Sequence, residues 1–329
     1  MARLAEPAEE HTVDLDRSLA VIHPRDGVMV QVCLLATLYF QRGHLLERRA
    51  AVAECFREYR ATMGDLLCWA HPGNNRFQHL APGDAPLKDP ARFLIEDQLR
   101  AYGSGFTWHG GRDAHSADPH WIAALGAPSG ESERQGALSY LQVAFPLTWF
   151  AEHAGGLPSL TLRWAKRLQA FHGYGGIGIV LSPRGTFAQR HENEVYGLSR
   201  RYPGLEIDYP IAHALDLKHG IKGGNWLTVL AEPWVERLGG EAVLRDALGE
   251  GFRLWPYAGG LMIQAGDHPQ LGDSNRLLAP AYYGRLARVL KPIRIETHGR
   301  IHAFGGLDRA GFDAWLARFD ADPAGFEHE

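Results

Sequence analysis

Residues 252–276 read FRLWPYAGGLMIQAGDHPQLGDSNR and hold two apolar, strand-like runs with only a short turn between them. The runs are Phe252–Trp255 and Gly260–Ala265, and a loop of small and polar residues follows the second. The same arrangement recurs at Leu19–His23 and Val28–Phe40, which the turn signal PRDG separates. Strands that follow one another without a helix favour an α+β protein with largely antiparallel sheets over a doubly wound one.

Two helices are predicted between strands, at Leu45–Thr62 and Pro158–His172, where apolar residues recur at helical spacing. The order strand, helix, strand therefore occurs twice. We expect an α+β fold with largely antiparallel sheets flanked by helices, built as two strand–helix–strand lobes in one compact body. The predicted division is a loosely ordered arm at 1–18, an N-terminal α+β lobe at 19–136 with a long loop near 103–136, a C-terminal α+β lobe at 137–320 and an acidic tail at 321–329.

Composition excludes several classes of protein. A formal net charge of −4 argues against a nucleic-acid-binding protein, whose domain is normally basic. Three cysteines without CxxC spacing predict a reducing compartment and argue against a disulfide framework or a zinc finger. Neither a membrane-length apolar run of about 18 residues nor an apolar signal segment is present. We therefore expect a cytoplasmic protein without a membrane partner.

The stretch Gly173–Gly178, GYGGIG, matches the dinucleotide-binding pattern GxGxxG letter by letter. That fingerprint requires a strand before the glycines and a helix after them, so that the helix N-terminus meets the pyrophosphate. Here a predicted helix precedes the glycines and a strand follows. We expect the glycines to end the helix and turn the chain, and we expect no cofactor.

Two catalytic interpretations of the loop after Ala265 lack their partners. Gly272-Asp273-Ser274 resembles the GDS block of serine hydrolases, which need a histidine base held by an acid. The pair of that spacing, Asp216 and His219, comes before the block, and no GxSxG motif is present. Asp267, His268 and Asp273 are residue types that a two-metal phosphoesterase uses, but the other ligand blocks of such a site are missing. The histidines of the chain show no paired spacing that would hold a metal.

A structural role suits this loop better, because short Asp and Asn side chains bond nearby backbone amides and Arg pairs with carboxylates. We predict a hydrogen-bonded clasp between the strand at 260–265 and a helix at 280–290. Its members are Asp267, His268, Gln270, Asp273, Asn275 and Arg276.

Five ordered blocks of the sequence resemble a known family. They are YGGIGIVLS at 174–182, the region 205–226 with its core GIKGGNWLT, GLMIQAGDHPQLGDSNR at 260–276, VLKPIRIE at 289–296 and WLARFD at 315–320. Together they are similar to the type VI secretion immunity proteins, formerly a domain of unknown function. Further residues in these blocks are Gly175, Gly176, Gly220, Lys222, Asn225, Trp226, Lys291 and Pro292.

The resemblance implies a cytoplasmic inhibitor that binds and occludes a cognate effector toxin, such as a nuclease, without catalysis of its own. We expect toxin contacts in acidic and aromatic residues of the region 73–136 and of a loop at His213–His219, because specificity should lie outside the shared scaffold. The candidates are Trp108, Asp113, Asp118, Trp121 and Asp216. A homodimer is compatible with this role. The alternatives are a GDS-type hydrolase that uses Ser274 and a structural or oligomerisation protein.

Overall fold

The computed structural model describes residues 20–23, 27–72, 76–81, 89–95, 103–153, 155–184, 190–296, 309–320 and 327–328. Its strands are β1 (Val21–His23), β2 (Gly27–Phe40), β3 (Trp69–His71), β4 (Gln78–His79), β5 (Ser104–His109), β6 (Trp121–Gly126), β7 (Ser139–Phe145), β8 (Ala170–Leu181), β9 (Leu227–Ala231), β10 (Phe252–Tyr257), β11 (Gly260–Ala265), β12 (Leu278–Ala279) and β13 (Glu327–His328). Its longer helices are α2 (Leu46–Met63), α6 (Gly156–Leu168), α8 (Glu192–Arg201), α11 (Gly240–Leu248), α12 (Tyr283–Leu290) and α13 (Arg309–Leu316). The shorter ones are α3 (Ala91–Leu94), α4 (Ser129–Gln135), α5 (Leu147–Glu152), α9 (Pro210–Asp216) and α10 (Glu232–Arg237), with 3₁₀ turns at Gly64–Leu66, Ser274–Arg276 and Lys291–Ile293.

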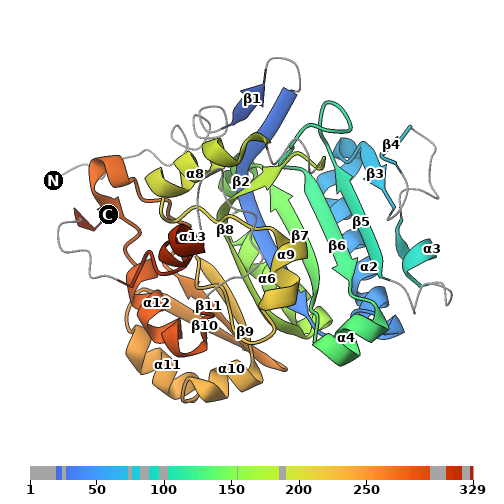
Figure 1. Ribbon diagram of the computed structural model, residues 1–329. Helices are drawn as coiled ribbons and strands as arrows, with labels where there is room; N and C mark the ends of the chain where they lie inside the picture. Colours follow the sequence, from blue (N-terminus) through green and yellow to red (C-terminus); the bar gives the residue numbers. More distant parts are fainter. Residues whose placement is uncertain are drawn as a thin grey trace.

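One antiparallel sheet of eleven strands dominates the fold, so the predicted α+β class is confirmed. The strand order is β10-β11-β9-β8-β2-β7-β6-β5-β3-β4, with β1 paired to β2. The 14-residue β2 lies at the centre and pairs with β8 on one side and β7 on the other. Its sequence GVMVQVCLLATLYF is almost uniformly apolar, as expected of a strand buried on both faces. The two predicted lobes therefore share one continuous sheet (Figure 1).

The two faces of the sheet pack against different helices. Alternate residues of β2, such as Leu34 and Leu38, belong to a core that includes Phe56 of α2 and Trp164 of α6. The intervening residues face a second, smaller core that includes Leu217, just after α9. Figure 1 shows α9 in front of the sheet and α2 behind it. On this second face, α9 packs against β7.

The segment near 103–136 differs from the expectation. The predicted long loop is wrong, because the chain forms β5, β6 and α4 there. Strands β5 and β6 pair antiparallel, with Ser104 opposite Gly126 and His109 opposite Trp121. Its Gly- and His-rich composition favours a loop, but tertiary pairing overrides that local preference. The arm at 1–18 lies outside the described residues. So does the tail at 321–329, apart from β13, which pairs with β12.

The glycine-rich stretch at 173–178 lies inside β8 and is not the turn that we expected from the sequence. The turn after α6 is made by Gln169, whose φ is +47°. The order helix, turn, strand leaves no helix N-terminus after the glycines, which is what a pyrophosphate site of this type requires. No helix in the described part of the chain is long and apolar enough to cross a membrane.

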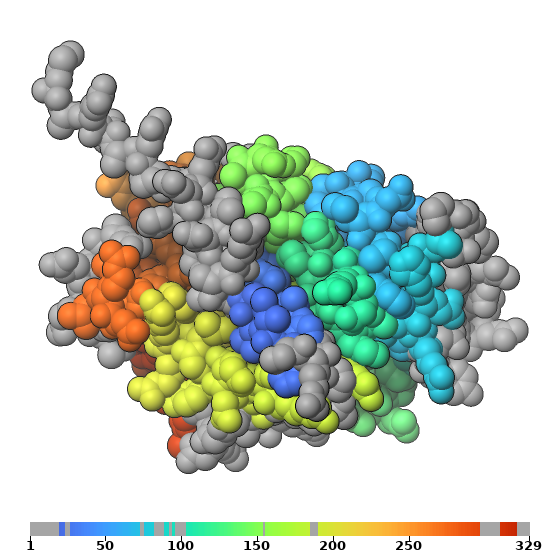
Figure 2. All heavy atoms as spheres, turned by 90° about the horizontal axis from the view of Figure 1, so that it is seen from above, coloured from blue at the N-terminus to red at the C-terminus, as the bar shows by residue number. Residues whose placement is uncertain are grey.

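One end of the sheet brings distant segments together. Figure 2 shows β1 (blue) beside the chain near residue 200 (yellow) and the segment near 110–120 (blue-green). The ring centroids of His23 and His191 lie 5.8 Å apart, and the backbone N–H of Ala117 donates to the Val28 carbonyl at 2.7 Å. The β1–β2 hairpin thus contacts both the start of α8 and the β5–β6 connection.

Candidate functional site

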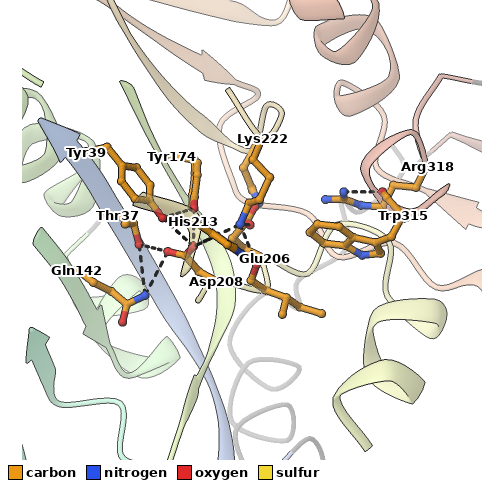
Figure 3. Close-up of polar contacts among 12 residues, drawn as sticks. Thr37, Tyr39, Gln142, Tyr174, Glu206, Asp208, His213, Lys222, Trp315 and Arg318 are labelled. Atoms are coloured by element: carbon orange, nitrogen blue, oxygen red, sulfur yellow. Dashed lines mark hydrogen bonds and ion pairs between the residues drawn. The ribbon is translucent and has the colours of Figure 1, made fainter. Parts of the chain in front are cut away.

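A buried carboxylate lies against the second face of the sheet, where side chains from several elements meet (Figure 3). It belongs to Asp208, which precedes α9 and has no exposed side-chain surface. Six side chains contact its two oxygens: Thr37 (2.5 Å), Tyr39 (3.1 Å), Gln142 (3.2 Å), Tyr174 (2.5 Å), His213 (2.7 Å) and Lys222 (3.4 Å). They come from β2, β7, β8, α9 and the segment after α9. The carboxylate therefore connects the centre of the sheet to α9.

The charges in this cluster are set by burial and by the ammonium group of Lys222. Burial alone would raise the pKa of Asp208, but Lys222 and the hydrogen bond with His213 hold that pKa well below its usual range. Burial, together with Lys222, lowers the pKa of His213. At pH 7 the imidazole is therefore neutral and donates its Nδ1 proton to the ionised Asp208.

Lys222 links Asp208 to a second buried carboxylate, Glu206. The Lys222 Nζ lies 2.5 Å from Glu206 Oε1, donates to the Ile207 carbonyl at 2.8 Å and lies 4.3 Å from the ring centroid of Tyr174. Glu206 Oε2 accepts a further hydrogen bond from Asn225 at 2.9 Å. Both charged side chains are thus buried with partners, which is the condition for charge to be tolerated inside a protein.

A second buried cation attaches the C-terminal helix to this region. Arg318 follows α13, donates to the Pro203 carbonyl at 2.7 Å and stacks 3.8 Å from the ring centroid of Trp315. Burial lowers its pKa to about 10, so it stays charged at neutral pH. Lys222 lies 5.9 Å from the same indole, so Trp315 interacts with both cations.

A groove of about 590 Å³ opens beside Asp208. Its lining comes from β3, β5, β6, β7, β8, the start of α8 and α9, and from the segments next to β4, β8 and α9. The lining residues are His71, Phe77, Thr107, Trp121, Ala123, Tyr140, Gln142, Ile179, Val180, Leu181, Ser182, Pro183, Glu192, Asp208, Tyr209, Pro210, Ile211, Ala212 and Leu215. Gln142 and Asp208 belong both to the groove and to the buried cluster.

The sequence matches the protein family described as type VI immunity for VRR-NUC (TsiV) over residues 51–319. The chain belongs to this immunity family. A similar solved structure is the type VI secretion system (T6SS) protein PA0821 of Pseudomonas aeruginosa, which is 25% identical and superposes with a TM-score of 0.82. That similarity covers 96% of this chain and 92% of PA0821, and a search of curated proteins gives no match. The resemblance to type VI immunity proteins is confirmed.

The predicted clasp of this family member contacts mostly backbone and neighbouring helices. Asp273 accepts from the backbone of Asn275 at 3.0 Å and pairs with Arg201 of α8 at 3.2 Å. The carboxylate pairing expected of Arg276 is made at Asp273 by Arg201, and Arg276 donates its backbone N–H to the Asp273 carbonyl.

The remaining clasp residues contact three other parts of the fold. Gln270 accepts from the Ala281 N–H at 2.9 Å, just before α12. Asp267 pairs with Arg253 on the exposed surface, and the His268 ring lies 5.7 Å from that of Phe150. These contacts support the predicted structural role, which stays a prediction.

Two glycines of the family blocks lie where a side chain would collide with neighbouring groups. A Cβ on Gly176 would lie 2.2 Å from the side-chain oxygen of Asn225, and one on Gly220 would lie 2.6 Å from the Ile293 carbonyl. Gly175 has more space, since its nearest neighbour would be 3.3 Å away. Of the other block residues, Trp226 is buried and donates to the Gly266 carbonyl, Lys291 pairs with Asp320 at 3.3 Å, and Pro292 lies in the 3₁₀ turn after α12.

Replacing Gly176 by alanine is expected to lower the free energy of unfolding by about 2–4 kcal/mol. The new methyl would displace Asn225, which bonds both Glu206 and the Trp226 backbone. Urea unfolding followed by tryptophan fluorescence measures the loss. Gly175→Ala in the same strand is the matched control and should cost clearly less, because its Cβ meets no atom closer than 3.3 Å. Equal losses for the two variants would contradict this explanation.

The five predicted toxin contacts occupy different environments. Trp108 is only 1% exposed and packs against Phe56 in the core, so it is wrong as a contact residue. Trp121 lines the groove, although its side chain is 8% exposed. Asp113 and Asp118 bond Ser116 and His120 within the β5–β6 connection.

The loop expected at His213–His219 also needs correction, because α9 covers Pro210–Asp216. His213 is fully buried on this helix and bonds Asp208, whereas Asp216 lies at the helix C-terminus. The cluster formed by Asp208, Gln142 and His213 was not predicted from the sequence. Asp208 and His213 lie in the family block 205–226 but Gln142 lies outside it on β7, so only the tertiary structure joins the three. No group of His, Cys, Asp and Glu suited to a metal ion occurs among the residues that the structure describes.

Proposed function

We propose that this protein binds a VRR-NUC nuclease effector of the type VI secretion system, blocks it by occlusion, and catalyses no reaction itself. The family match over residues 51–319 carries this proposal, because the family is described as immunity for VRR-NUC. A nuclease acts on DNA inside the cell, so the inhibitor would work in the cytoplasm.

Charge supports the choice of partner. Nucleases engage the phosphate backbone through Lys and Arg, which leaves a basic surface around the active site. The present chain carries a formal net charge of −4. Opposite charge accelerates the encounter of two proteins and disfavours wrong partners. Direct binding of this chain to nucleic acid is disfavoured by the same charge.

The contacts of Ser274 speak against the hydrolase alternative. Its Oγ donates to the Arg200 carbonyl at 3.0 Å, and the neighbouring Asp273 pairs with Arg201. A serine nucleophile needs instead a histidine base that an acid orients. Here Ser274 bonds a backbone carbonyl, and Asp273 pairs with an arginine.

Co-expression with a VRR-NUC effector nuclease tests the proposed function. We expect bacteria that produce the nuclease alone to die, and bacteria that also produce this chain to grow. With purified proteins, plasmid cleavage should stop at an equimolar amount of the immunity protein. Continued killing and cleavage despite an equal amount of folded protein would contradict the proposal.

Ser274→Ala is expected to protect as well as wild type, because removing this exposed hydroxyl costs one surface hydrogen bond and no catalytic group. Growth in the co-expression assay is the measurement, and the variant should also hydrolyse p-nitrophenyl acetate no differently from wild type. Ester hydrolysis that disappears with Ser274→Ala would favour the hydrolase. A homodimer stays a prediction, which light scattering of the purified protein tests.

A further inference from the structure

Strand β10 is a free edge of the large sheet. It lies at one end of the strand order, and the two-residue β4 lies at the other (Figure 1). The Gly266 N–H donates to the Gly251 carbonyl at 2.8 Å, and these two residues continue the register of β10 with β11. Because hydrogen-bonded pairs alternate along an antiparallel ladder, Phe252, Leu254 and Pro256 turn their backbone groups away from β11.

These outward backbone groups are available to a further strand. In the part of the chain that the structure describes, no group bonds the outward backbone of Phe252, Leu254 or Pro256. Phe252 and Leu254 offer an N–H and a carbonyl each, whereas Pro256 offers a carbonyl alone. An edge of this kind is a template for pairing with a strand of another chain.

The exposed face of β10 carries one cation and one aromatic ring. Side chains alternate along a strand, so Phe252 and Leu254 pack on the large core and Arg253 and Trp255 lie on the opposite face. Arg253 is 56% exposed and Trp255 is 39% exposed. The N–H groups of Arg253 that pair with Asp267 lie in the guanidinium plane, whereas an aromatic ring stacks on the flat face of that plane.

We propose that β10 pairs with β10 of a second copy of this chain, so that the two sheets join into one. A twofold axis at Leu254 places this residue opposite its counterpart and Phe252 opposite Pro256 of the second copy. The two Leu254 residues then exchange N–H and carbonyl bonds, and each Phe252 N–H donates to a Pro256 carbonyl. Proline leaves only the Phe252 carbonyls, at the ends of the pairing, to bond water.

The exposed side chains select this register. The axis at Leu254 places Arg253 of each copy opposite Trp255 of the other, with Cβ atoms about 4.5–5.5 Å apart. The guanidinium can stack on the indole at that spacing, and the symmetry repeats the contact. An axis at Arg253 would instead bring the two arginines together. The strand is therefore complementary to itself.

Two substitutions at one exposed position test the pairing. Trp255→Lys is expected to weaken self-association at least about tenfold, because the axis doubles both the lost stacking and the new repulsion from Arg253. Trp255→Glu should stay within about threefold of wild type, because an ion pair takes the place of each stacked pair. Sedimentation velocity of the full chain from about 1 µM to about 1 mM gives the dissociation constants of the dimers. Leu277→Lys is the control, at a position 58% exposed and outside β10, and should dimerise like wild type.

Cysteine cross-linking tests the register. Residues 253 and 255 of the two copies form non-hydrogen-bonded pairs, whose Cα spacing of about 4.5 Å is within disulfide range. With copper phenanthroline as oxidant, a mixture of Arg253→Cys and Trp255→Cys is expected to form a covalent dimer with one copy of each. Each variant alone should cross-link no more than wild type, whose three cysteines give the background.

The outcomes leave the proposed function untouched, because a monomer and a dimer can both occlude a nuclease. A wild type that stays monomeric at every concentration would overturn the dimer. Equal losses for Trp255→Lys and Trp255→Glu, or a mixture that cross-links no better than its components, would overturn this register. If Trp255→Lys weakens binding of the effector and leaves self-association unchanged, the occupant of the edge is the effector. Unchanged thermal midpoints of the variants at this exposed position ensure that folding is not what is measured.

Discussion

Asp208→Asn is expected to lower the free energy of unfolding by about 3–5 kcal/mol, the range measured when one partner of a buried ion pair is removed. The amide has one acceptor oxygen where the carboxylate has two, and its NH₂ group would face donors from Thr37 and Gln142 or from Tyr174 and His213. Lys222 would keep only one carboxylate partner.

Urea unfolding at pH 7 measures this loss. Asp267→Asn is the control, because Asp267 is 67% exposed and pairs with Arg253, which is 56% exposed. Surface pairs contribute less than about 1 kcal/mol, so the control should unfold almost as wild type does. A loss for Asp208→Asn no larger than that of the control would show that the buried cluster does not stabilise the fold.

Stability should fall steeply as the pH drops below 6.5. Burial lowers the pKa of His109 and of His172 to about 4 from an ordinary value of 6.5. Below pH 6.5 the unfolded chain therefore binds protons that the folded chain does not. The free energy of unfolding is unaffected by these groups above pH 7 and decreases from pH 6.5 to about 4. The slope approaches about 1.4 kcal/mol per pH unit for each histidine.

Urea midpoints at pH 7, 6 and 5 test this dependence, and two substitutions assign it. His109 Nδ1 accepts from the Gly111 N–H, so His109→Asn can keep that contact without titrating. His172 Nε2 contacts the Leu217 carbonyl, which His172→Gln can imitate. The double variant should lose most of the slope. His213, whose pKa burial also lowers, accounts for a remainder in the same direction. An undiminished slope in the double variant would refute the assignment.

Much of the fold could be predicted because local pattern and tertiary context agree. The unbroken apolar run of β2 and the adjacent runs of β10 and β11 favour strands in the sequence, and they form strands in the fold. The segment 103–136 was misread because its glycines and histidines locally favour a loop. In the fold, Phe106 and Trp108 of β5 face the core at alternate positions, and this burial outweighs the local preference.

The candidate site could be predicted only in part. Lys222 and Asn225 were found because a family block includes them, yet their partner Glu206 was not singled out. Asp208 and Thr37 are 171 positions apart, and although Asp208 lies in the family block 205–226, no spacing in the sequence links it to Thr37. The groove itself depends on how α9 lies on the sheet, which no spacing in the sequence encodes. Sequence patterns identify segments, whereas this site arises where segments meet.

The position of β2 between β7 and β8 has a consequence for how such proteins diversify. The first long strand of the chain completes the sheet of the second half, so a gene cut near codon 136 yields two pieces that each lack a central strand. Exchange of halves between two immunity genes would join mismatched strands at the core. Substitutions at exposed positions leave this central pairing intact, so we expect new specificities to arise there.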